Sequence, residues 1–403
     1  MTLFPIRRFA LALLLGSIVS ATSAWGKPVK LAILLPLSNV NKYSGNQAKQ
    51  GFEMGVQQEV AELGVDWAAW VKFEYFDTRS DKAHALELAK SAIAQNARAV
   101  LGLHSSAVTL HVRDYVLDTA KVPYVVFAGG VSSKIRRKHP LFIRVSNDAK
   151  MVMLPLASWL KAHPIVSSAK PRWVCIYTDY TWGRTSCDAF KMGYEDVGEE
   201  IGRVPSPLKT VSKKKEIVKL VKFKPDFAVA PFTGAEANVF LRDYFRFHVQ
   251  KKIPLVMAGS AFTERHLKRY SQTLEQYNTG VGILHGDIYT PKLTNEANRH
   301  FVTRYKQLYD MRPTNHAMRA YDAGRLLVKA LAKLEGNWDG AKVVQLMKTL
   351  PTVSPRSGEI LKFDSYGDAI SPGYIYITKR EGDRLVKDLL GKVPAVNLDN
   401  YKK

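Results

Sequence analysis

The side chains best suited to chemistry lie in one short stretch, His104-Ser105-Ser106, which is followed by His111. A serine beside a histidine could act as a nucleophile with its base, but no acid that would orient the histidine is visible. The two histidines are seven residues apart, and no cysteine or carboxylate completes a metal-binding set with them. We therefore predict hydrogen-bonding roles for these side chains, with no catalytic residue and no metal site.

Other sequence signatures of enzymes are also missing. The chain has no G-x-S-x-G elbow, no phosphate-binding lysine loop and no H-E-x-x-H. Gly280, Gly282 and Gly286 resemble a dinucleotide loop, but the third glycine comes one residue late and no helical pattern follows. We expect no cofactor and no enzymatic activity; a hydrolase that uses Ser106 with His104 is the alternative.

Two cysteines, Cys175 and Cys187, could form a disulfide in an oxidising compartment. Cys175 falls in a predicted strand and Cys187 in the first turns of the next predicted helix. Both a bridge and two buried thiols are compatible with this placement, so the choice stays open.

The first 26 residues have the three parts of a secretory signal peptide. Arg7 and Arg8 form a basic start, residues 9–19 are apolar, and small residues follow up to Gly26. The apolar run is shorter than the ~20 residues that span a bilayer, which argues against a retained anchor. We expect cleavage near Lys27 and a periplasmic location.

The chain is strongly basic. Its formal net charge is +23, and loss of two arginines with the predicted signal peptide (23 − 2) leaves +21. Such a charge could attract nucleic acid, an acidic surface or an anionic ligand. The basic residues are scattered, and the densest cluster, 209–224, lies between predicted elements, so we expect a solvated face and no nucleic-acid partner. A basic scaffold that binds anionic wall material is a further alternative.

Two series of alternating strands and helices follow the signal peptide. The apolar run 29–35 is typical of a strand covered on both faces, and apolar residues at helical spacing come next. Further strands are predicted at 71–75, 99–101 and 123–127, and a second series has strands at 173–177, 226–230 and 255–258. Each series predicts a doubly wound α/β lobe, and the missing Pro-, Gly- or Ser-rich linker predicts a short joint.

Several segments, taken in order, carry a resemblance to a known family. They include LAILLPLSNVNKYSGNQAKQGFEMGVQQ at the start, then VPYVVFAGG, FIRVSNDAKM, DYTWG and PDFAVAPFTGAEA, and finally AYDAGRLLVKAL and GEILKFDSYGD. Over nearly the whole chain from Lys27, these segments resemble the leucine/isoleucine/valine type of periplasmic solute-binding protein, the substrate-capturing component of an ABC importer.

The resemblance implies the type I periplasmic binding protein fold, in which two doubly wound parallel-sheet lobes are joined by a three-strand hinge. Lobe one would take residues 27–146 and 284–360, and lobe two residues 147–283 and 361–403. In that family the lobes close on a small-molecule solute, and the closed form docks on an ABC transporter permease. We expect these two partners and a monomer; a sensor that reports to a membrane receptor is the alternative function.

The ligand site should lie where strands end, because loops and helix N-termini present free N–H groups there. Ser105 and Ser106 follow the strand that ends at Leu101, and they would hold a carboxylate with hydroxyl and backbone donors. A helix cap without a ligand is the other interpretation of a serine at this position. The resemblance adds six further ligand-binding residues, namely Tyr43 and Trp182 as aromatic walls, Ala128 and Gly130 in the next loop, and Thr233 and Ser260 from lobe two.

Two of these positions depart from the family's amino-acid binders, which hold the ammonium group of the ligand with a hydroxyl and an acid. Gly130 and Ser260 stand at those positions, and a buried ammonium without a carboxylate partner is costly. We therefore expect capture of a small carboxylate, amide or amino-acid-like solute, with an acid that lacks an amine favoured. A one-residue shift in alignment would bring Glu236 or Glu264 into consideration.

Overall fold

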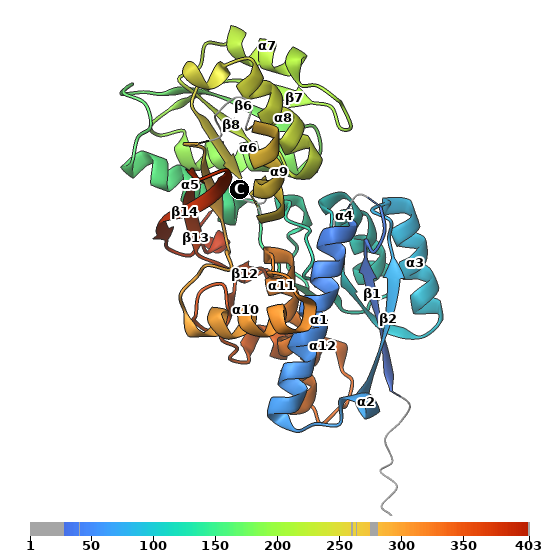
Figure 1. The fold of residues 1–403 in the computed structure, drawn as a ribbon. Coiled ribbons are helices and arrows are strands. Elements are labelled where there is room, and N and C mark those ends of the chain that lie inside the picture. The colour runs from blue at the N-terminus through green and yellow to red at the C-terminus, as the bar shows by residue number, and fades with distance from the viewer. Residues whose placement is uncertain (1–27, 40, 259–260, 263, 275–280, 402–403) are drawn as a thin grey trace, which may run out of the picture.

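The computed structural model describes residues 28–39, 41–258, 261–262, 264–274 and 281–401. These residues form two α/β lobes, one drawn in blue and orange and the other in green, yellow and red (Figure 1). The predicted fold class is confirmed. In the described part of the chain, no helix combines the length and the hydropathy needed to span a bilayer.

Lobe one is built on a five-stranded parallel sheet in the order β2-β1-β3-β4-β5. Successive side chains of the interior strand β1 (Val29–Leu35) enter two different cores, Leu31 and Ile33 on one face and Ala32 and Leu34 on the other. This explains why the strand is apolar except at Lys30. The strands are β1 (Val29–Leu35), β2 (Val71–Asp77), β3 (Ala97–Gly102), β4 (Tyr124–Val126) and β5 (Phe142–Arg144).

Helices cover both faces of this sheet. Helices α1 and α11 pack against each other closely, since a Cβ atom at Gly51 would lie 2.1 Å from the carbonyl oxygen of Ala317. This contact fixes the start of α11, which matters for the site described below. The helices of lobe one are α1 (Lys42–Leu63), α2 (Trp67–Trp70), α3 (Lys82–Ala94), α4 (Ser106–Asp114), α10 (Glu296–Tyr309), α11 (Asn315–Lys333) and α12 (Gly340–Thr349).

Lobe two contains a seven-stranded sheet in the order β14-β13-β10-β9-β8-β6-β7. Five strands are parallel, and the hairpin β13-β14 pairs antiparallel at one edge. The strands are β6 (Arg172–Thr178), β7 (Glu199–Ser206), β8 (Phe227–Ala230), β9 (Leu255–Ala258), β10 (Leu284–Asp287), β13 (Gly373–Glu381) and β14 (Arg384–Val393). The helices are α5 (Lys150–Ala162), α6 (Thr181–Tyr194), α7 (Lys214–Lys222), α8 (Gly234–Arg246) and α9 (Glu264–Leu274).

Strand pairing shifts two of the predicted lobe boundaries. We predicted that lobe one resumes at residue 284, but β10 pairs with β9 and β13, so Leu284–Asp287 belong to the second sheet. We also placed residues from 361 in lobe two. Instead, the short strands β11 (Lys362–Phe363) and β12 (Ala369–Ile370) lie beside β5, because the Arg144 amide donates to the Gly367 carbonyl at 2.8 Å.

Within the described ranges the chain passes between the two sheets three times, after β5, after β10 and after β12. A buried ion-pair network holds the first and third passages together. The Arg144 guanidinium donates to the Asp368 carboxylate at 2.6 and 2.7 Å and to the Asp148 carboxylate at 2.8 Å. It also donates to the carbonyl oxygens of Gly130 and Ser132, both at 2.9 Å. The passages are therefore anchored to the loop after β4.

Candidate functional site

The two predicted serines lie together at the carboxyl edge of the lobe-one sheet. Ser105 caps α4, and its hydroxyl accepts a hydrogen bond from the Val108 amide at 3.2 Å. Ser106 is buried, and its hydroxyl accepts from the Ser132 amide at 3.1 Å. Ser105 thus has the helix-capping role that the sequence left as the other interpretation, whereas Ser106 joins the loop after β3 to the loop after β4.

Gly130 lies in that second loop, as predicted from its position in the sequence. Its amide donates to the His104 carbonyl at 2.8 Å, and its φ of +68° is in the left-handed region that glycine tolerates best. A Cβ atom there would also lie within 3.0 Å of the Thr109 hydroxyl oxygen. The position therefore has no room for a hydroxyl-bearing side chain.

Lobe two contributes an aromatic group that contains Trp182. This side chain is 9% exposed, and its ring lies 6.0 Å from the ring of Tyr180. The Tyr180 hydroxyl is 3.3 Å from the hydroxyl of Thr233, which precedes α8. Burial, the main cause, raises the pKa of Tyr180 to about 12. Helices α4 and α6 are in contact, and Val131 of the loop after β4 packs against the hydrophobic cluster that contains Trp182, so the two lobes meet here.

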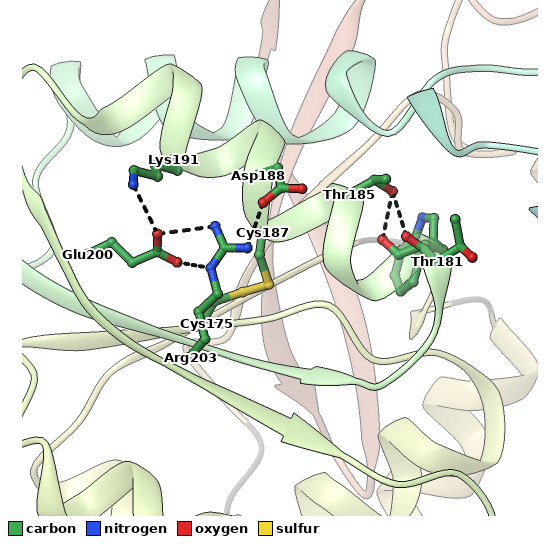
Figure 2. Close-up of a disulfide and its surroundings, with 9 residues drawn as sticks. Cys175, Thr181, Thr185, Cys187, Asp188, Lys191, Glu200 and Arg203 are labelled. Atoms are coloured by element: carbon green, nitrogen blue, oxygen red, sulfur yellow. Dashed lines mark hydrogen bonds and ion pairs between the residues drawn. A yellow bond between two sulfur atoms is a disulfide. The ribbon is translucent and has the colours of Figure 1, made fainter. Parts of the chain in front are cut away.

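Helix α6 is fixed to its own sheet by a disulfide. Cys175 of β6 and Cys187 of α6 are bonded, with their Cα atoms 6.0 Å apart, which settles the choice that the sequence left open. Figure 2 shows this bridge beside the Arg203 guanidinium, which contacts Glu200 and Asp188. The bridge ties the helix that carries Trp182 to the strand beneath it.

Among the other predicted residues, Tyr43 is not brought together with this group. Tyr43 lines a separate hollow with Lys42, Asn46 and Tyr309, and none of the other predicted ligand residues lines that hollow. Ser260 and the side chain of Glu264 lie outside the described residues. Glu236, the other acid considered for an ammonium group, is paired with the buried Lys213 at 2.5 Å.

Ala128 leads to a polar cluster that the sequence did not reveal. Its carbonyl oxygen is 2.6 Å from the His316 Nδ1 atom and accepts from the Arg319 guanidinium at 3.3 Å. The His316 ring stacks on the His104 ring with centroids 4.9 Å apart. Arg319 also donates to the Asn147 side-chain oxygen at 2.5 Å. The cluster therefore joins both lobe-one loops, the first passage between the sheets and the start of α11.

The electrostatics of this cluster are set by burial and by the arginine. Burial lowers the pKa of Arg319 to about 9, the charge of Arg356 adds to this effect, and Asp287 opposes it. Burial and the nearby Arg319 charge lower the pKa of His104 to about 4, and they lower that of His316 well below its ordinary value. Near neutral pH the site therefore holds one guanidinium cation beside two neutral imidazoles.

Comparison with known proteins identifies the family. The family described as "Periplasmic binding protein" matches residues 28–383, which is most of the chain. The chain belongs to the periplasmic binding protein family. The resemblance drawn from the sequence is thereby confirmed.

Relatives of this periplasmic binding protein are spread over several bacteria. It is 24% identical to the Leu/Ile/Val-binding protein homolog 6 of Brucella abortus, over 87% of this chain and 88% of that protein. Among solved structures, an ABC transporter substrate-binding protein from Sphaerobacter thermophilus matches with a TM-score of 0.80 and 19% identity, covering 91% and 98% of the two chains. An R. palustris solute-binding protein in complex with 4-hydroxybenzoate matches with a TM-score of 0.79 and 22% identity, covering 92% and 98%.

Sequence reasoning missed His316 and Arg319 in this periplasmic binding protein because α11 has the apolar spacing of a core helix. The available signal was an imidazole and a guanidinium three residues apart in its first two turns, where they share one face. His104 was considered, but as a partner of His111 or as a base for Ser106. The structure separates those two, since α4 begins at Ser106 and His111 is exposed on it.

Proposed function

We propose that this protein is an extracytoplasmic solute-binding protein, which captures a small organic acid between its lobes and delivers it to an ABC importer. The observation that carries the proposal is the meeting of the lobe-one loops with α6 of lobe two. This contact lies beside the segments through which the chain passes from one sheet to the other, since Arg144 at the end of β5 donates to the Gly130 carbonyl in the loop after β4. Other members of this fold bind solutes, and the R. palustris protein in complex with 4-hydroxybenzoate is one of them.

Capture works by a population shift rather than by chemistry. A solute that contacts both lobes stabilises the closed form, and its binding free energy moves the equilibrium between open and closed forms. In this protein Ser105, Ser106, Ala128 and Gly130 act from lobe one, and Trp182 and Thr233 act from lobe two. Tyr43 and Ser260 stay predictions from the resemblance.

A catalytic role for Ser106 is disfavoured by its surroundings. Its hydroxyl is engaged by the Ser132 amide. The candidate base, His104, packs on His316, and neither of its ring nitrogens forms a hydrogen bond. We therefore propose a non-enzymatic protein that is secreted to the periplasm after cleavage of residues 1–26, which lie outside the described residues.

The proposal is tested with the mature protein and a panel of benzoate, 4-hydroxybenzoate and leucine. Thermal unfolding should show a Tm increase with at least one of these solutes, because binding to the folded state stabilises it. Small-angle scattering should then show a smaller radius of gyration with the same solute. Mass spectrometry of native protein extends the panel to any solute that copurifies. If no solute in the panel or in the copurified fraction raises Tm or changes the shape, the protein does not capture solutes by lobe closure.

A further inference from the structure

Three arginines in the described ranges are almost completely buried, and they differ in their partners. Arg144 contacts the carboxylates of Asp148 and Asp368. Arg356 contacts the carboxylate of Asp322 at 2.8 Å. In these two cases an acidic side chain of the protein compensates the buried cation.

Arg319 has no such partner within the described part of the chain, although it is only 2% exposed. Two of its N–H groups donate to Asn147 and Ala128, and both acceptors are neutral oxygens. Its Nε atom is buried and makes no hydrogen bond. In the described part of the chain no carboxylate lies within ion-pair distance of this guanidinium, and Asp287 acts on its charge only from beyond that distance. Because a buried charge that is so weakly compensated is costly, this guanidinium is poised for an anion.

The neighbours of Arg319 strengthen this conclusion. Both ring nitrogens of His104 are shielded from solvent and lack hydrogen-bond partners. The His316 Nδ1 atom cannot donate to the Ala128 carbonyl and also accept from Arg319, which lies 2.9 Å away, since it carries at most one proton. The cluster therefore has unpartnered donors at the Arg319 Nε atom and at one ring nitrogen of the neutral His104, and an anion could accept hydrogen bonds from both.

The location of the cluster matches the proposed capture site. His104 directly precedes Ser105 and Ser106, and Ala128 belongs to the loop of Gly130. Lobe two reaches the start of the same helix, because the Asn315 side-chain amide on α11 donates to the Asp287 carboxylate of β10 at 3.5 Å. An anion seated here would be in reach of both lobes.

We propose that Arg319, with His104 and His316, holds the carboxylate of the captured solute. The solute is then an organic acid that lacks an ammonium group. A guanidinium binds a carboxylate through two parallel hydrogen bonds, whereas the positive charge of Arg319 would repel an ammonium group at this site. This inference rests on the proposed function and adds which residues hold the carboxylate and that the solute carries no ammonium group.

The test compares each acid with its neutral amide, using benzoate with benzamide and 4-hydroxybenzoate with 4-hydroxybenzamide. An acid that copurifies with the native protein is included with its own amide. Titration calorimetry of the full mature protein should show at least one acid binding about 10- to 100-fold more tightly than its amide. Arg319→Gln should remove that preference, and Arg319→Lys should keep part of it.

Two controls keep the outcome clear. Arg325→Gln changes an arginine on the same helix whose charge is already paired with Glu59 at 2.8 Å, so acid binding should be unchanged. His104→Asn serves as a second variant of the proposed carboxylate site if Arg319→Gln does not fold. It should weaken binding of the acid more than binding of the amide.

Equal affinity for acid and amide, or acid binding that survives both Arg319→Gln and Arg319→Lys unchanged, would overturn the inference and leave solute capture intact. The same holds if the solute that copurifies is neutral or is an α-amino acid. Absence of any bound solute in wild-type protein, by copurification and across the panel, would count against both the inference and the proposed function.

Discussion

Burial determines the charge state of the histidines at the junction of the lobes. His104, His285 and His316 all have a lowered pKa, and burial is the largest cause in each case. For His104 the pKa in the folded protein is about 4, whereas a histidine of the unfolded chain titrates near ~6.5. Between these values the unfolded chain binds more protons than the folded protein, so stability falls as the pH is lowered through this window.

His104→Asn should therefore make the free energy of unfolding less dependent on pH between about 6.5 and 4. The measurement is urea unfolding of both proteins at several pH values without solute. His316 and Arg319 face the His104 ring and stay in place in the variant, so the difference between the two curves isolates His104. Parallel curves for the two proteins over this range would show that His104 titrates normally in the folded state.

Residue types alone could not show that the three buried arginines differ in their acidic partners. The sequence placed Ser105, Ser106 and Gly130 near strand ends, because strand order and helix spacing follow from local patterns. Arg144, Arg319 and Arg356 look alike in the sequence. Their difference depends on which acids the fold brings within contact, and two of those acids, Asp368 and Asp322, lie 224 and 34 positions away from their arginines.

At the scale of single elements, the bridge between β6 and α6 is the main covalent constraint in lobe two. It joins cysteines 12 residues apart and fixes the helix that carries Trp182. A cross-link of this kind stabilises a protein chiefly by restricting its unfolded chain, and a loop of about this size is worth roughly 3 kcal/mol in the chain-entropy account.

The double variant Cys175→Ala/Cys187→Ala should lower the free energy of unfolding by about 2–4 kcal/mol. Urea unfolding of the wild-type protein with and without a thiol reductant provides the matched comparison, because reduction should reproduce most of the loss. The double variant itself should not respond to the reductant. Equal stability of oxidised and reduced wild-type protein would mean that the bridge does not stabilise lobe two.

At the scale of the whole molecule, the order of the elements was predictable but their pairing was only partly so. The alternation of strands and helices, read with the family resemblance, predicted two lobes that the chain enters more than once. It could not assign β10 to the second sheet or β11 and β12 to the side of β5. Such pairings depend on contacts between distant segments: β10 pairs with β13, whose partner residues lie 87 to 93 positions later, and Arg144 bonds to Gly367.

The Arg144 network joins two of the passages between the lobes, and its loss should affect the entire protein. Asp368→Asn removes one of the two carboxylates and leaves a buried guanidinium undercompensated, so we expect a loss of about 3–5 kcal/mol in the free energy of unfolding. Arg319→Met is the matched comparison, because it removes a buried cation that has no acidic partner in the described part of the chain. In the absence of solute it should cost much less, or even stabilise the protein. Urea unfolding of the two variants side by side measures this difference, and similar losses in both would mean that the surroundings of Arg319 already compensate its charge.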